Sequence, residues 1–171
     1  MGDFRVWYAS RDPYHCIFRM IRLMTAKSEP ILLEQLRILD MFLMFPVLLH
    51  RLSLPADIKE RFRQLAVPTP ANFFVKLPGT ASVWQDLQIY QSTALKRLTG
   101  LGLLKRDALR DRYASLEIEL VPDEIMNKAI AQNEVGEALT RFLVDDVGSL
   151  PMLGRNGLVK RAGLPSRGPV V

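Results

Sequence analysis

A change of hydrophobic period near residue 100 constrains the fold more than any other feature of the sequence. Before it, Val83, Leu87 and Tyr90 are spaced as on one face of a helix, and Ser92 is of the type that caps a second, shorter helix over 93–99. After it, apolar residues alternate with glutamates over 116–120, the period of a half-buried strand. Helix, turn and helix followed by two short strands is the outline of a winged helix, with residues 106–112 as its charged wing.

Helical apolar stripes on both sides of this module predict further helices. Asp12 followed by Pro13 indicates a helix start, because Asp accepts free backbone N–H groups and proline suits the first helical position. Later stripes predict helices over 31–43, 55–65, 123–131 and 135–143. The predicted fold is therefore mainly α, a winged-helix (winged helix-turn-helix) module with a small β-hairpin and flanking helices. Residues 1–146 form one domain whose winged-helix core spans 82–121.

The predicted helix over 31–43 is strongly apolar. Its stripe leaves Glu34, Gln35, Arg37 and Asp40 facing elsewhere, and Pro46 kinks or ends it. The apolar stretch from residue 31 to residue 49 exceeds what one short helix of a small domain needs to bury. Such a stretch suits contact with a partner or with a second copy of the chain.

The positive charge of the chain is concentrated at its C-terminus. Of the net charge of +5, residues 1–146 carry +1 and residues 147–171 carry +4, with no acid in the second segment. The last 24 residues also hold five glycines and three prolines. We expect 147–171 to be a basic docking tail that orders on a partner. Its candidate contact residues are Arg155, Leu158, Lys160 and Arg161.

Residues that carry catalysis or bind metals are sparse in this sequence. The chain has two distant histidines and one cysteine, so it lacks the Cys/His pairs of a zinc site and cannot form an intramolecular disulfide, which favours a reducing, cytoplasmic setting. Neighbours in a helix point about 100° apart, so His15 and Cys16 are read as a partly exposed ring beside a buried thiol. Gly100-Leu101-Gly102 lacks the following Gly-Lys-Ser/Thr of a phosphate-binding loop. We predict no catalytic residue, no metal and no cofactor.

No membrane association is predicted either. The most apolar stretch, residues 36–49, is broken by Arg37, Asp40 and Pro46, and falls short of the roughly 20 apolar residues that cross a bilayer. The N-terminus has no basic region leading into an apolar run.

The predicted winged helix offers a candidate contact surface for DNA or for a protein partner. A recognition helix reads base edges while basic residues hold phosphates. The candidate contact residues are Gln91, Thr93, Lys96, Arg97, Arg106, Arg110 and Arg112. Four acids, at positions 107, 111, 117 and 119, make this face only weakly positive, so DNA contact and protein docking both remain open.

Three segments, at residues 18–23, 33–46 and 157–164, carry a family resemblance. The chain resembles the middle component of bacterial three-component ABC (ABC-3C) systems, which are similar to SMC-type defence machines such as Lamassu. The resemblance implies a small winged-helix accessory subunit. Its implied partners are an SMC-like or Rad50-like ABC ATPase and a third component, often an effector, and it implies that the subunit itself is not the catalyst.

Three hypotheses follow. The leading one is a non-enzymatic adaptor of an ABC ATPase that acts on DNA in antiphage defence. The second is a winged-helix DNA-binding transcriptional regulator that reads DNA through residues 91–97. The last is an enzyme whose site is assembled from scattered residues.

Overall fold

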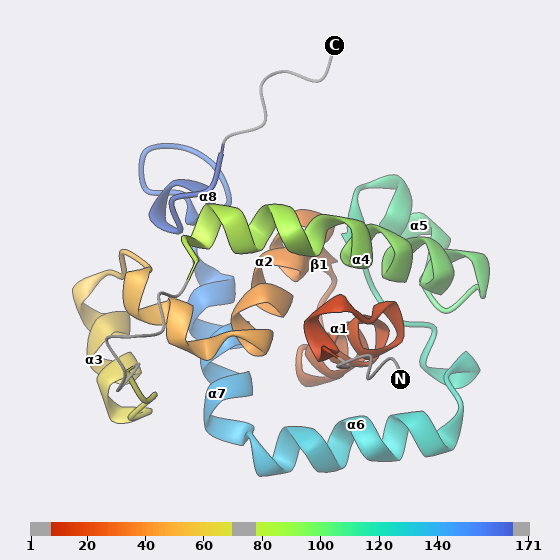
Figure 1. Cartoon of the computed structure of the whole chain (residues 1–171). Helices are drawn as coiled ribbons and strands as arrows, with labels where there is room; N and C mark the ends of the chain where they lie inside the picture. The colour runs from red at the N-terminus through yellow and green to blue at the C-terminus, as the bar shows by residue number, and fades with distance from the viewer. Residues whose placement is uncertain (1–7, 70–77, 166–171) are drawn as a thin grey trace, which may run out of the picture.

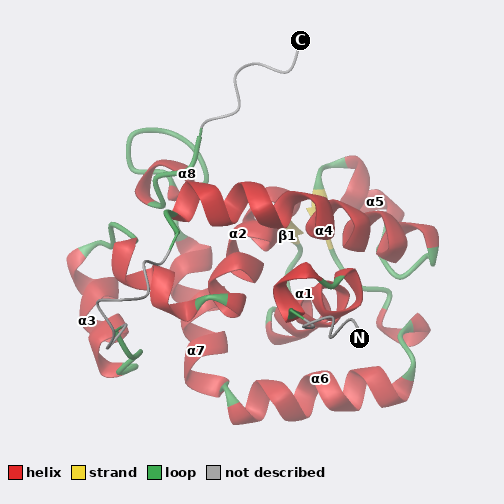
Figure 2. Ribbon diagram, viewed as in Figure 1, coloured by secondary structure: helices red, strands yellow, loops and turns green. Residues whose placement is uncertain are grey.

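The computed structural model describes residues 8–69 and 78–165, and this part of the chain is mainly helical with one two-stranded antiparallel sheet (Figures 1 and 2). The α-helices are α1 (Pro13–Ala26), α2 (Leu33–Met44), α3 (Ala56–Gln64), α4 (Thr80–Gly100), α5 (Arg106–Arg110), α6 (Asp123–Val135), α7 (Glu137–Arg141) and α8 (Leu158–Arg161). The strands are β1 (Ile31–Leu32) and β2 (Tyr113–Ala114). Short helices of other types are η1 (Ala9–Arg11), η2 (Pro46–Arg51), η3 (Ile118–Leu120), the π-helix η4 (Phe142–Asp146) and η5 (Val147–Ser149).

Helix α1 lies at the centre of the molecule and contacts α2, α4 and α6 (Figure 1). Its start is the predicted one. The Asp12 carboxylate accepts a hydrogen bond from the Tyr14 backbone N–H at 2.8 Å, and Pro13 occupies the first helical turn. The predicted start of α6 after Pro122 is also confirmed.

Helix α2 is enclosed by its neighbours, and the eight consecutive residues from Gln35 to Phe42 are all buried. The prediction that Gln35, Arg37 and Asp40 face away from the core is therefore wrong. An apolar stripe defines one buried face, but a helix surrounded on all sides also buries its polar positions, provided that they find partners. Much of the apolar stretch that the sequence suggests for a partner is buried inside this chain.

Helix α4 is a single helix of 21 residues, about 30 Å long by the usual rise per residue. The predicted turn at Ser92 is absent, so the assignment of a helix-turn-helix to residues 82–99 is wrong. Nothing in this segment breaks a helix, because it holds neither proline nor an internal glycine before Gly100. The Thr93 hydroxyl donates back to the Ile89 carbonyl at 2.8 Å, a hydrogen bond that is compatible with a continuous helix.

The sheet joins segments from both halves of the chain. Ile31 pairs with Ala114 and Leu32 with Tyr113, while an isolated antiparallel bridge joins Leu104 to Leu116. Residues 103–105 and 115–117 thus pair as the predicted hairpin requires. The wing, however, contains helix α5, and the predicted strand stops early, because residues 118–120 form the 3₁₀ helix η3 before Pro122 turns the chain into α6.

The C-terminal segment is folded onto the rest of the chain as far as residue 165. Leu158, Val159, Ala162 and Leu164 are buried in the same core as Phe142 and Val147. The prediction that this segment orders only on a partner is wrong for residues 147–165, because its few apolar side chains are spaced to cover the core. The remainder of the predicted tail lies outside the described residues.

Candidate interaction surface

A buried polar network joins α1, α2 and α4. Asp40 is fully buried, and its carboxylate accepts from Arg19 Nε at 2.6 Å and Arg19 Nη2 at 3.2 Å. Arg37 donates from Nε to Gln91 Oε1 at 3.1 Å, and its guanidinium lies 4.6 Å from the centroid of the Trp84 ring. Through these contacts the network ties the three helices α1, α2 and α4 together.

Gln91, which the sequence assigns to the outward face of a recognition helix, is fully buried in this network. Its Nε2 donates to the Arg37 carbonyl and to Asp40 Oδ2, each at 2.9 Å. Gln91 therefore cannot contact DNA or a partner in this fold. The error follows from the predicted break at Ser92, which shifts the helical phase.

The other candidates on α4 lie on or near its open side. Thr93 is half-buried, and Lys96 and Arg97 are exposed. Arg97 Nη1 donates to the Tyr14 hydroxyl at 2.8 Å, and its guanidinium lies 4.8 Å from the centroid of that ring. Arg97 thus ties α4 to the start of α1, whereas Lys96 points outward without an ion pair among the described residues.

The three wing arginines are exposed but differ in their surroundings. Arg106 begins α5 and forms no ion pair within the described part of the chain, while Arg110 Nη2 lies 3.6 Å from Asp107 Oδ1. Arg112 has a positive φ of 65°, and its carbonyl accepts from the Leu33 backbone N–H at 2.9 Å, where β1 meets α2. The structure brings Arg106, Arg110 and Arg112 to one end of the molecule, near the C-terminal end of α4.

The tail candidates divide into structural and exposed residues. Leu158 is fully buried in the core. Arg161 donates to the Ser53 carbonyl at 2.8 Å and so attaches α8 to the segment between η2 and α3. The predicted contact of Leu158 with a partner is therefore wrong, because its side chain has no exposed surface. Arg155 and Lys160 are exposed.

Cys16 and His15 have separate partners. Burial raises the pKa of the Cys16 thiol, with Asp40 adding to the effect, and its Sγ lies 3.6 Å from Asp40 Oδ2. Burial and then the Arg19 charge lower the pKa of His15, whose Nδ1 lies 2.9 Å from Arg19 Nη1. Cys16 is thus held as a neutral thiol, unlike a nucleophilic thiolate.

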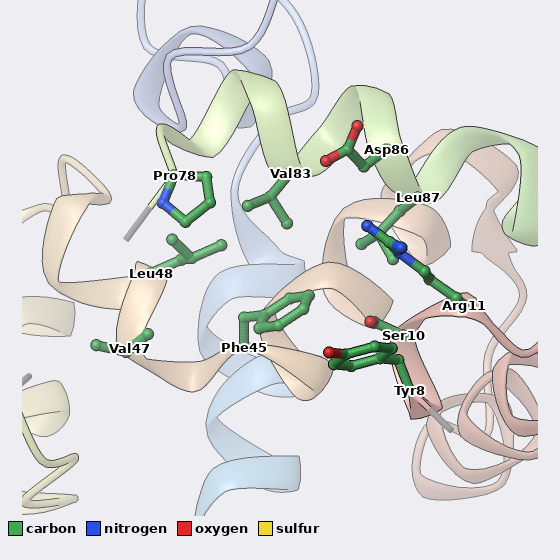
Figure 3. A pocket seen from close by; sticks show the side chains of 10 residues that line it. All are labelled: Tyr8, Ser10, Arg11, Phe45, Val47, Leu48, Pro78, Val83, Asp86 and Leu87. Carbon is green, nitrogen blue, oxygen red and sulfur yellow. The ribbon is translucent and has the colours of Figure 1, made fainter. Parts of the chain in front are cut away.

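A hollow of about 330 Å³ lies between η1, the end of α2 with η2, and the first turns of α4 (Figure 3). Phe45, Leu48 and Val83 form much of its apolar lining, and Arg11 and Asp86 supply its charged groups. None of its lining residues was a predicted site residue. A few apolar residues close together in space, from segments far apart in the chain, leave no sequence signal.

Within residues 8–69 and 78–165, no three His, Cys, Asp or Glu side chains lie close enough together to hold a metal ion. None of the helices described combines the length and the hydrophobicity that a bilayer-spanning helix requires.

The fold defines a small, mainly helical protein with a two-stranded antiparallel sheet, and the sequence-predicted contact residues that stay accessible lie on its open surface. The chain belongs to the family of ABC-three component (ABC-3C) system Middle Component 5, whose family model matches residues 5–167. The family resemblance inferred from the sequence is thereby confirmed. Comparisons with curated proteins and with solved structures found no match.

Proposed function

We propose that the chain is a non-enzymatic accessory subunit that links an SMC-like ABC ATPase to a third, effector component. In this proposal the complex acts on DNA in bacterial antiphage defence, as Lamassu-type systems do, and works in the cytoplasm. The observation that carries the proposal is the match of nearly the whole chain to a middle-component family. A middle component belongs to a system of several proteins, so its partners are part of its function.

The use of the polar groups supports a non-enzymatic role. Arg19, Asp40 and Gln91 are buried and bonded to one another, and Cys16 is a buried neutral thiol. Accessible charged residues such as Arg110 and Lys160 lie on open surface, which suits binding more than chemistry that needs water excluded.

The order of the elements supports a winged-helix module with a different assignment from the one that the sequence suggests. Helix α1, strand β1, helix α2 and helix α4 are followed by two paired segments, and residues 113–117 pair with both β1 and residues 103–105. In this interpretation α4 is the third helix, residues 106–112 form the wing, and η2 with α3 belongs to an insertion between the second and third helices.

Co-purification tests the adaptor proposal. The tagged full chain is expressed together with the other components of its own ABC-3C system, and the complex is analysed by native mass spectrometry. We expect the ABC ATPase and the third component to co-purify with the chain in fixed ratios. Recovery of the chain alone, under conditions in which both other proteins are folded, would refute the proposal.

A DNA-binding transcriptional regulator is the second candidate, and the exposed face of α4 favours it. Gln85, Gln88, Ser92 and Lys96 lie exposed along that face, and such side chains can reach base edges in a major groove. We predict that Lys96→Glu with Arg97→Glu weakens any DNA binding without unfolding the chain, since both side chains are exposed. Tight binding to one operator sequence by a chain without protein partners would favour the regulator over the adaptor.

A further inference from the structure

A groove of about 950 Å³ runs beside α5. Its walls come from the turn between α1 and β1, the C-terminal end of α4, α5 itself and residues 115–120. We call it the α5 groove. Figure 1 shows α5 next to the C-terminal half of α4, away from α3 and α8. The groove is at the upper end of the range of about 300–1,000 Å³ for ligand pockets, so it has room for several side chains.

Leucines line the α5 groove and also project from its edge. Leu104 is 2% exposed and Leu109 is half-buried, while Leu120 is 60% exposed. Ile118, two residues before Leu120, is 66% exposed. Single exposed apolar residues are ordinary on protein surfaces, but apolar residues gathered at a groove are typical of an interaction site.

The charged residues that line the α5 groove are two cations, Lys105 and Arg106, and two acids, but they differ in whether a partner within the chain neutralises them. Lys105 and Arg106 line the groove and form no ion pair among the described residues, whereas Asp107 lies 3.6 Å from Arg110. Glu117 is the other acid in the lining. The groove therefore combines an apolar interior with two cations whose charge is available to a partner.

This combination favours a protein segment over nucleic acid. Phosphates pair with the cations but gain nothing from Leu104, Leu109 and Leu120, which nucleic acid would leave in contact with water or with sugar. An amphipathic helix uses both features, because its apolar stripe enters the groove while acids beside that stripe reach the rim.

We propose that the α5 groove binds an acidic amphipathic helix contributed by another component of the same ABC-3C system. The apolar stripe of that helix packs on Leu104, Leu109 and Leu120, and its carboxylates pair with Lys105 and Arg106. This inference rests on the proposed function, from which it takes the partner.

Two groove variants and two matched controls test this inference. Leu120→Asp and Arg106→Glu each change a groove residue, while Leu153→Asp changes an exposed leucine of the loop before α8 and Lys59→Glu changes an exposed cation of α3. The affinity of each full-length variant for the purified remaining components of the system is measured by isothermal titration calorimetry. Melting temperatures verify that each variant is folded.

We expect each groove variant to bind at least about tenfold more weakly, as for central interface residues, with both controls unchanged. If the complex forms and the groove variants bind as tightly as the controls, the groove proposal is wrong while the proposed function stands. If mixed-sequence duplex DNA binds the chain alone, and binding is weakened by Arg106→Glu but not by Leu120→Asp, the rim is a nucleic-acid site and the proposal is also wrong. If the unmodified chain forms no complex, the proposed function fails and the groove proposal fails with it.

Discussion

At the scale of single residues, the buried ion pair between Arg19 and Asp40 is the contact whose loss we expect to lower the stability of the fold most. Its side chains are 2% and 0% exposed, so each charge depends on the other for compensation. Exposed pairs behave differently, because water and salt screen them. Arg63 and Glu60, 3.0 Å apart on α3, are such a pair, with side chains 67% and 59% exposed.

We predict that Asp40→Asn lowers the free energy of unfolding by about 3–5 kcal/mol, because it leaves the Arg19 guanidinium charged, buried and uncompensated. Chemical denaturation measures the change. Glu60→Gln is the matched control and should change stability by less than about 1 kcal/mol. A loss for Asp40→Asn no larger than that of the control would mean that the pair is not buried as the structure describes.

We also predict a dependence of stability on pH that comes from His15. The pKa of His15 is lowered in the fold from its ordinary value of 6.5, so the unfolded chain binds its proton more readily. The stabilisation from neutral His15 is present above about pH 6.5 and is lost as the pH falls through the lower pKa of the folded state. Denaturation curves between about pH 7 and pH 5 should show falling stability.

His15→Gln should flatten this dependence, because glutamine does not titrate and can still accept a hydrogen bond from Arg19. An equal slope in the variant and in the natural chain would show that other groups cause the loss.

At the scale of elements, the sequence predicts those features that depend on neighbours in the chain. The start of α1 at Asp12-Pro13, the start of α6 after Pro122 and the antiparallel pairing of 103–105 with 115–117 are all encoded locally. The burial of Gln91 and Asp40 depends on segments 51 residues apart, which no local pattern reveals. Polar residues inside apolar helices, such as Arg19 between Phe18 and Met20, were the available signal for this network.

The continuity of α4 can be tested at Ser92, which the sequence pattern predicts to be a helix cap. We predict that Ser92→Ala raises the free energy of unfolding by about 0.5 kcal/mol, since Ser92 is exposed inside a helix and alanine is the better helix former. Urea denaturation with a matched Ser82→Ala control, near the start of the same helix, measures the change. A loss of about 1 kcal/mol for Ser92→Ala would instead indicate an N-cap and a broken helix.

At the scale of the whole molecule, the C-terminal segment belongs to the same core as the helices before it. Gln35 of α2 donates to the Gly148 carbonyl at 2.9 Å, and the Ser53 backbone N–H donates to the Arg161 carbonyl at 3.1 Å. By its composition, rich in glycine, proline and positive charge, the C-terminal segment resembles a tail that does not pack on the domain. A few apolar residues at suitable positions are nevertheless enough to fold it onto the core.

We therefore predict that Leu158→Ala lowers the free energy of unfolding by about 2–5 kcal/mol, since it empties a fully buried site. Leu153→Ala, at a leucine that is 73% exposed in the preceding loop, should change stability by no more than about 0.5 kcal/mol. Thermal and chemical denaturation compare the two variants. Equal, small effects would mean that α8 is not docked.

The central claim is that this chain works by binding and contributes no chemistry of its own. The most direct test measures DNA-dependent ATP hydrolysis by the purified ABC ATPase of the same system, with and without the chain. We predict that the chain alone hydrolyses no nucleotide and that, once bound, it changes the DNA-dependent rate of the ATPase. Turnover of a nucleotide or nucleic acid by the chain alone, or an ATPase rate that is unaffected by it at saturating concentration, would contradict the account.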